Sequence, residues 1–504
     1  MKPSVETIKT VSGSVRLATQ YFANSVLGLV FFIFLARLVT KAELGVYAAL
    51  MLSYGFFQTI GMLGLNVAAA HFVPKLLAEG KQEGASSAAR TIILIGISSS
   101  IVISLAYFLL APFLSLALTR AYTYMDLFRA TSIAVLSVTF SVVIDGLMQG
   151  VREFSQLALI RLVGQVLRIA VSLALLLLGY GLIAVVVGWA VFGVTISLLP
   201  FPFLLRNISL RGHLYPFRPI WRYSSPILGS SLLNFFSGQI DIFILMLLAL
   251  PVAVGGYNVA LTASSLLLTL VLTSVHSTLL PTMSGAYGRG GIRAVEDVLK
   301  KASKYVALAY FPICIGLASL SEPAVWLMAG KVYHESIAPL AVLASSSLTY
   351  GMGMLIIIAM SSTGMTRRVL EIYVTSNLGG ALSCALLIPI LGIEGAAIGR
   401  GLLFAFMLGY GFYTAKKIMK VHFDSEAVWK SLLSSVLMGL LLVAFQTFHA
   451  STFMLPVYLL AGASTYALFL KVLNAINSYD LMILKEILPR KLATLVRLAD
   501  KIYT

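Results

Sequence analysis

The sequence predicts an all-α polytopic membrane protein with 14 transmembrane helices, arranged as two pseudo-symmetric six-helix lobes plus two C-terminal helices. Its composition, the length of its apolar runs and the placement of its cations lead to this fold class. Of the 504 residues, 59% are hydrophobic and only 11% are charged, whereas soluble domains carry about 25% charged residues. The mean hydropathy is +0.96. This composition excludes an ordinary soluble globular protein.

The apolar runs have the length that a membrane crossing requires, which is about 20 residues for a helix. The first six cover 14–39, 46–73, 91–118, 126–150, 155–178 and 181–205. The next six cover 225–250, 254–284, 304–329, 337–362, 369–391 and 393–415, and the last two cover 430–449 and 452–474. Short connections with turn residues, such as Gly179-Tyr180-Gly181, separate them. Each run is therefore expected to form one spanning helix.

The distribution of Lys and Arg predicts the orientation of these helices. The chain has 36 Lys and Arg against 19 Asp and Glu, a net charge of +17. With a cytoplasmic N-terminus, 29 of these cations fall in cytoplasmic loops and tails or at the cytoplasmic ends of the runs. Five fall on the outer side, and Arg168 and Arg400 lie deeper within spans. Cytoplasmic loops of membrane proteins collect cations in this way. Both termini are therefore expected in the cytoplasm of a plasma-membrane protein, and the charge excess needs no nucleic-acid partner.

Sequence landmarks recur about 210 residues apart and indicate an internal repeat. Leu44-Gly45-Val46-Tyr47 matches Val254-Gly255-Gly256-Tyr257, Val73-Pro74 matches Leu280-Pro281, and Gly181 matches Gly392. Because each half has an even number of helices, the repeats should be parallel and related by an axis along the membrane normal. The expected divisions are a first lobe (1–206), a basic linker (207–224), a second lobe (225–421), two further helices (422–476) and an amphipathic tail (477–504). This tail is expected to lie on anionic lipids of the cytoplasmic leaflet.

Several kinds of chemistry lack their motifs in this sequence. It contains no phosphate-binding G-x-x-x-x-G-K-[ST] loop and no H-E-x-x-H pattern. Its two cysteines, Cys314 and Cys384, sit in separate apolar runs, which is not a metal-ligand spacing. The expected outer loops are short, so a membrane-embedded glycosyltransferase has little room for a catalytic domain. We expect a transporter and no enzyme, with no metal site and no cofactor, and with Na⁺ or H⁺ as the candidate coupling ion.

Charged side chains at membrane depth are costly, so those on the fifth run need an explanation. Arg161, Gln165 and Arg168 follow a spacing of four and then three residues, which places them on one helix face. Asp145, on the antiparallel fourth run, should lie at the depth of Arg161 and form a structural ion pair with it. Arg168 lies about 20 Å along its helix and has no equally obvious acid. It is predicted to bind an anion in a cavity; the alternative is a buried arginine held by carbonyl groups.

The first run carries a second polar stripe, with Arg16, Gln20 and Asn24 four residues apart. The repeat offset carries Asn24 onto Asn234 in the seventh run, so the two amides are expected to face one cavity. The alternatives are a membrane-interface anchor for Arg16 and interhelical hydrogen bonds for the amides. The predicted substrate cavity contains Arg16, Gln20, Asn24, Gln165, Arg168 and Asn234.

Two further groups are candidates for a coupling-ion or proton site. Asp241 lies in the seventh run and His276 lies in the eighth. An intramembrane carboxylate and an imidazole are the groups that could hold a cation or a proton there. The alternatives are that Asp241 only neutralises Arg400 and that His276 is a packed, neutral histidine.

A set of short motifs in fixed order resembles a known family. They include Glu43-Leu44-Gly45-Val46-Tyr47, Met148-Gln149-Gly150-Val151-Arg152, Tyr223-Ser224-Ser225-Pro226, Ser321-Glu322-Pro323, and Gly392-Ile393-Glu394-Gly395. With them the chain resembles the polysaccharide and oligosaccharide flippases of the multidrug/oligosaccharidyl-lipid/polysaccharide exporter (MOP) superfamily. The tail from Asp480 to Arg497 looks like that of archaeal members.

This resemblance implies a fold of six plus six helices with two added helices, and alternating access around a central cavity. The implied substrate is a sugar on a polyprenyl (pyro)phosphate, moved from the cytoplasmic to the outer leaflet. The family has no universal motif that would assign site residues here. Two other functions stay open: a multidrug or cation antiporter of the same superfamily, and a membrane scaffold that recruits glycosyltransferases.

Overall fold

The computed structural model describes residues 23–448 and 454–475. Every regular element in these ranges is a helix, so the predicted all-α class is confirmed. Eleven helices are long and apolar enough to cross a membrane, and Ala23–Leu38 forms a shorter apolar helix. This agrees with a multi-pass membrane protein. The predicted site residues Arg16 and Gln20 and the predicted amphipathic tail lie outside the described residues.

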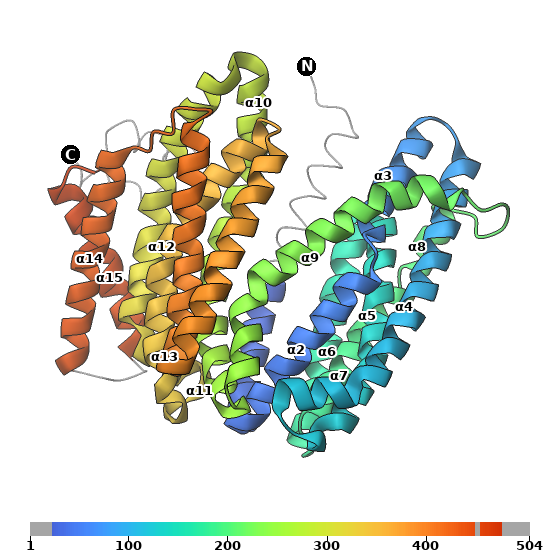
Figure 1. Cartoon of the computed structure of the whole chain (residues 1–504), viewed down its shortest axis with the longest axis horizontal. Helices are drawn as coiled ribbons and strands as arrows, with labels where there is room; N and C mark the ends of the chain where they lie inside the picture. Colours follow the sequence, from blue (N-terminus) through green and yellow to red (C-terminus); the bar gives the residue numbers. More distant parts are fainter. Residues whose placement is uncertain (1–22, 449–453, 476–504) are drawn as a thin grey trace. The chain divides into compact units, whose positions relative to one another are not determined.

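The chain forms two compact units, Met1–Asn258 and Val259–Thr504, and Figure 1 labels the helices α2 to α15. After Ala23–Leu38, the elements of the first unit are α2 (Lys41–Gly61), α3 (Leu65–Ala78), α4 (Gln82–Thr119), η1 (Tyr122–Tyr124), α5 (Met125–Gly150), α6 (Phe154–Leu177), α7 (Ile183–Leu198), α8 (Phe201–Asn207) and α9 (Phe217–Leu248). The elements that follow are α10 (Pro251–Ser319), α11 (Ser321–Ala329), η2 (Lys331–Ser336), α12 (Ile337–Ser362), α13 (Thr366–Lys416), α14 (Ser425–Phe448) and α15 (Leu455–Val472).

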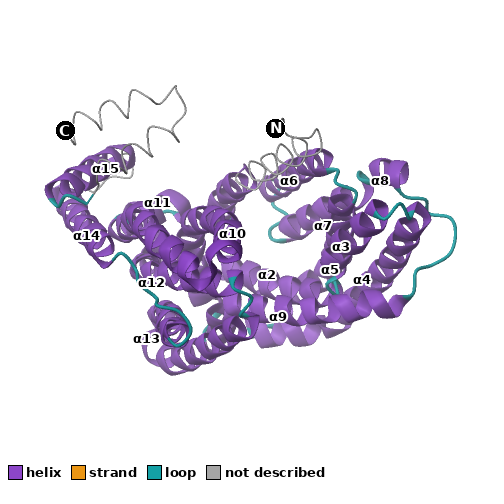
Figure 2. Cartoon of the chain, turned by 90° about the horizontal axis from the view of Figure 1, so that it is seen from above, coloured by secondary structure: helices purple, strands orange, loops and turns teal. Residues whose placement is uncertain are grey.

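The first unit is built around α5, which contacts α3, α4 and α7. Its core contains Leu65, Ile92, Ile144 and Leu147, all fully buried. Helix α9 runs alongside α2 (Figure 2) and also contacts α3 and α4. Because of these contacts α9 belongs to the first unit, whereas the sequence repeat starts the second lobe with this helix. Helix α9 also begins at Phe217, inside the predicted linker, directly after the N-terminal capping residue Pro216, whose ψ of 132° is not helical.

The predicted second span is interrupted near its middle. Leu63 and Gly64 both have positive φ, which separates α2 from α3. A β-carbon on Gly64 would lie 2.6 Å from the Ser224 carbonyl oxygen of α9. The glycine therefore permits both the left-handed backbone conformation and the close approach of α9.

The starts of α2 and α10 pack closely, through the two motifs that the sequence repeat relates. A β-carbon on Gly45 would lie 1.8 Å from the Pro251 carbonyl oxygen, and one on Gly255 would lie 2.2 Å from the Lys41 carbonyl oxygen. These two contacts are reciprocal, because the repeat relates Lys41 to Pro251 and Gly45 to Gly255. Glycine is needed at both places because no side chain fits between the two backbones.

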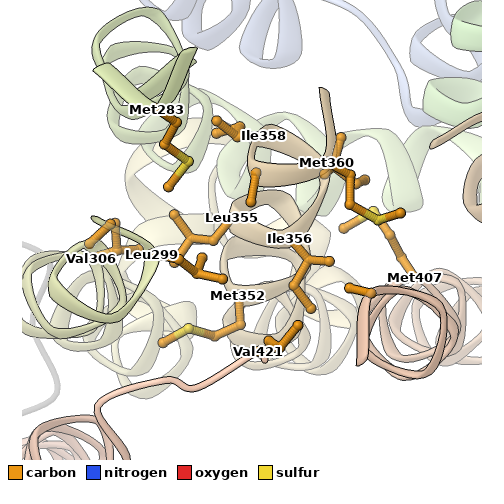
Figure 3. Packing of buried hydrophobic residues seen from close by; sticks show 14 of the residues in the cluster. Met283, Leu299, Val306, Met352, Leu355, Ile356, Ile358, Met360, Met407 and Val421 are labelled. Atoms are coloured by element: carbon orange, nitrogen blue, oxygen red, sulfur yellow. The ribbon is translucent and has the colours of Figure 1, made fainter. Parts of the chain in front are cut away.

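In the second unit, two long helices contain backbone breaks. Helix α10 leaves helical geometry at Gly290 and Gly291, and α13 does so at Gly392, where φ is +57°. The core between α10, α12 and α13 is rich in methionine and branched residues, including Met283, Met352, Ile356 and Met407 (Figure 3). Helices α14 and α15 pack on each other.

Candidate substrate site

Arg168 lies within the first unit, on a face of α6 that also carries Gln165. Its Nε donates to Gln165 Oε1 at 3.1 Å, and its guanidinium carbon lies 5.1 Å from the ring centre of Phe31. The Gln165 residue is 8% exposed, and Phe31 is 2% exposed. No acidic side chain among the described residues forms an ion pair with Arg168. The cation is therefore held by an amide and an aromatic ring, an interaction that gains strength when water is excluded.

Aromatic residues of α2 and α7 complete this environment. The phenol groups of Tyr47 and Tyr54 are close enough to interact electrostatically with the Arg168 guanidinium. Trp189 of α7 stacks on Tyr54 with ring centres 5.0 Å apart, and it lies 5.9 Å from the Tyr47 ring. The sequence did not identify these three aromatic residues, because aromatic side chains in apolar runs are usually core or lipid-facing. We call Gln165, Arg168, Phe31, Tyr47, Tyr54 and Trp189 the Arg168 site.

Asp145 of α5 and Arg161 of α6 contact each other, as the sequence predicted. Arg161 Nε donates to Asp145 Oδ1 at 2.7 Å, and a second guanidinium nitrogen contacts the other carboxylate oxygen. Gln149 Nε2 also donates to that oxygen, at 3.1 Å. The Asp145 side chain is 15% exposed and the Arg161 side chain 12%. This bidentate pair joins two helices and removes an isolated charge from the membrane interior.

The two asparagines differ in their surroundings. Asn24 is partly buried, and its Oδ1 atom has no hydrogen-bond partner among the described residues. Asn234 of α9 is exposed. No hydrogen bond joins these two described side chains, so their predicted sharing of one cavity stays a prediction. A buried amide oxygen without a protein partner is a group that needs water or a ligand.

Asp241 of α9 is 1% exposed and accepts a hydrogen bond from the hydroxyl of Tyr257. Tyr257 lies at the start of α10 and is itself fully buried. It belongs to the repeated motif Val254-Gly255-Gly256-Tyr257, but the repeat did not predict its contact with Asp241. His276 lies further along α10 and is half-buried. Among the described residues, no group of three His, Cys, Asp or Glu side chains is arranged to hold a metal ion.

Comparison with known proteins identifies the family. The family described as polysaccharide biosynthesis protein matches residues 34–338, which is more than half of the chain. The chain belongs to this family. The resemblance seen in the sequence motifs is thereby confirmed. No curated protein matches the chain in sequence.

Solved structures show which fold this family member adopts. The lipid II flippase MurJ in an inward closed conformation superposes with a TM-score of 0.71 at 13% identity, covering 91% of this chain and 98% of that one. A multidrug resistance MATE transporter of the MOP superfamily, in its inward-facing conformation, gives 0.65 at 15% identity, covering 80% and 97%. A structure of a multidrug resistance MATE family transporter in an outward-facing conformation gives 0.57 at 17% identity, covering 81% and 94%. The chain therefore has the fold of the MOP superfamily.

Proposed function

We propose that this protein is a flippase that moves a polyprenyl-phosphate-linked oligosaccharide from the cytoplasmic to the outer leaflet by alternating access. The product would serve assembly of a cell-surface polysaccharide or of glycoprotein glycans. Membership of a polysaccharide biosynthesis family supports a glycan, and the superposition on a lipid flippase along 91% of the chain supports a lipid carrier. The reaction makes and breaks no covalent bond, so it needs no enzyme cofactor.

The observation that carries this proposal is the Arg168 site. A guanidinium without an acidic partner among the described residues, held at membrane depth by Gln165 and aromatic rings, attracts an anion. The substrate supplies one in its phosphate, and acidic sugars would supply others. We propose that Arg16, Gln20, Asn24 and Asn234 line the route of the glycan and that Asp241 and His276 serve a coupling Na⁺ or H⁺.

Fourteen membrane crossings with both termini in the cytoplasm are part of this proposal. The eleven long apolar helices include α13, and the breaks at Gly290–Gly291 and Gly392 divide α10 and α13 into two segments each. These two divisions raise the number of segments from eleven to thirteen, and the shorter helix Ala23–Leu38 is the fourteenth. The lobes of this topology are residues 1–206 and 225–421, joined by the basic linker 207–224. Residues 422–476 supply the last two helices, and the tail 477–504 would bind anionic lipids.

An antiporter of cationic compounds is the second candidate, because MATE transporters share the fold. A cationic cargo favours free carboxylates in its route, whereas Asp145 is paired with Arg161 and Asp241 accepts the Tyr257 hydroxyl. The surroundings of Arg168 favour an anionic cargo instead. A scaffold for glycosyltransferases would need no such site within the membrane.

The test is to deplete the protein in its own cells and to locate the lipid-linked oligosaccharide. We expect the glycolipid to be made but to stay on the cytoplasmic side, protected in intact cells from a membrane-impermeant glycosidase, with less surface glycan. Normal outward exposure together with lost resistance to cationic dyes would instead support the antiporter. A transport-inactive substitution that leaves glycosyltransferase complexes intact would exclude the scaffold.

A further inference from the structure

An apolar cavity lies within the first unit, between α2, α4 and α9. Its volume is about 310 Å³, and phenylalanine and leucine dominate its walls. The lining residues are Leu52, Ser53, Phe56, Phe57, Leu110, Phe113, Leu114, Leu118, Phe235, Phe236, Gln239 and Phe243. All of them lie in helices that are candidate membrane spans. On the proposed topology the cavity therefore faces the bilayer.

The inner wall of the cavity has no free hydroxyl group. The Ser53 hydroxyl is 2.9 Å from both the Ala49 carbonyl oxygen and the Tyr107 hydroxyl, so its hydrogen bonds are made inside the protein. Phe57 beside it is 8% exposed and packs edge-on against Tyr107, with ring centres 5.0 Å apart. Water does not fill an apolar cavity of this kind. While the cavity is empty, its wall atoms lack the van der Waals contacts that a bound apolar group would supply.

The rim of the cavity is open to the lipid-facing surface. Phe113 is 66% exposed, Leu110 is 44% exposed and Phe236 is 36% exposed. These apolar side chains would form the entrance for a hydrocarbon chain coming from the bilayer. A cavity of about 150 Å³ holds a benzene ring, so about 310 Å³ holds a single chain of roughly a dozen carbons.

Helix α2 separates this cavity from the Arg168 site. Leu52, Phe56 and Phe57 face the cavity, while Tyr47 and Tyr54, on another face of the same turns, approach Arg168. An α-helix is about 10 Å across. An apolar cavity and the cationic Arg168 side chain thus lie about one helix diameter apart, which matches the two ends of an amphiphile.

We propose that the α2/α4/α9 cavity binds the prenyl chain of the lipid carrier while the anionic head group is near Arg168. This inference rests on the proposed flippase function and extends it to the tail of the substrate. The size of the cavity favours a lipid with one chain. A phospholipid would bring two chains, and only one of them would fit.

The test uses the full-length protein in phosphatidylglycerol nanodiscs with a polyprenyl phosphate that carries a photoreactive diazirine on its chain. We expect labelled peptides from α4 and α9 that include the cavity lining, and competition by unlabelled polyprenyl phosphate. Leu114→Trp fills the cavity and should lower labelling about tenfold, the effect of losing about 1.4 kcal/mol of binding free energy. The matched control is Leu109→Trp, because Leu109 is 67% exposed and does not line the cavity. Its labelling should stay unchanged.

Two results would overturn the inference. One is equal labelling of the same peptides by a phosphatidylglycerol with a diazirine on its acyl chain, without competition by polyprenyl phosphate. The other is unchanged labelling in a Leu114→Trp protein whose thermal unfolding matches that of the control. Phe236→Ala is a second variant, which widens the rim of the cavity without overpacking it. Because the prenyl chain is proposed to enter at this rim, the substitution should shift the residues that the diazirine labels.

Flipping of a lipid-linked oligosaccharide in liposomes separates this inference from the proposed function. Competed prenyl labelling without any flipping would support the cavity and contradict the flippase. Flipping that depends on Arg168, with no prenyl labelling of α4 or α9, would contradict the cavity and leave the flippase intact.

Discussion

Asp145 and Arg161 show how two charges are made tolerable at membrane depth. Each is mostly buried, and the pair makes two contacts with further support from Gln149. Asp145→Asn should leave the arginine without its counter-charge and cost roughly 3 kcal/mol of stability, since breaking a buried pair is strongly destabilising. The loss is measured as a lower unfolding temperature of the purified protein in detergent.

The double variant Asp145→Asn/Arg161→Gln is the control for this pair. Because it removes both charges, it should cost less than the sum of the two single changes. Strictly additive losses would mean that the two side chains do not stabilise each other.

Arg168 differs from that pair because the described residues offer it an amide and aromatic groups but no carboxylate. Arg168→Ala should lower flipping about tenfold or more, the size of a lost charge-assisted hydrogen bond. Arg168→Lys keeps the charge but not the planar fork, so it should retain part of the activity. The measurement is transport per molecule of folded protein. If alanine reduces only the amount of folded protein, the arginine is structural.

At the scale of elements, Arg90 of α4 organises the segment that connects α8 to α9. Although it is 4% exposed, its guanidinium donates to the carbonyl oxygens of Ser209, Arg211 and His213. It also contacts Glu83 at 2.5 Å. These carbonyl groups belong to irregular backbone, which needs partners of this kind when it is covered.

Arg90→Ala should therefore loosen the connection between α8 and α9 without disturbing helices elsewhere. We expect hydrogen exchange of residues 208–216 to rise about tenfold or more, because their local opening becomes easier. Arg90→Lys should rescue little, since one ammonium group cannot reach three carbonyl groups. Arg206→Ala, at an exposed position on α8, is the control. Equal exchange in all three variants would show that the arginine does not hold this segment.

The contact between the starts of α2 and α10 depends on two glycines. Gly45→Ala would place a β-carbon 1.8 Å from the Pro251 carbonyl oxygen, so the helices must separate, at a cost of roughly 1–3 kcal/mol. Gly255→Ala should have a similar effect because the contact is reciprocal. Gly28→Ala has nothing within 4 Å and should be neutral or slightly stabilising. Similar unfolding temperatures for Gly28→Ala and Gly45→Ala would contradict the close contact.

At the scale of the whole molecule, the fourteen-crossing topology makes a prediction about sidedness. Cys314 and Cys384 are buried and are not joined in a disulfide, and both can be replaced to give a background without cysteine. Single cysteines in place of the exposed Arg211 and Lys331 should then react with a membrane-impermeant reagent from opposite sides. In intact cells only the position of Lys331 should label. Labelling of both positions from outside would reject the topology.

The helical membrane class, the family and the contact between Asp145 and Arg161 could all be predicted from the amino-acid sequence. These follow from apolar run length, motif order and spacing along antiparallel helices, all of which are local or periodic properties of the chain. The sequence also predicted the repeat that relates Gly45 to Gly255.

The packing of the helices was needed to show which side chains surround Arg168, where the apolar cavity lies and which carbonyl groups Arg90 holds. Tyr54, Trp189 and Phe31 come from three different helices, and in sequence they look like any other aromatic residues of an apolar run. The structure also placed α9 with the first unit, although the repeat starts the second lobe there. Contacts between distant segments depend on how the helices pack against one another, and hydropathy along the chain does not predict which helix faces meet.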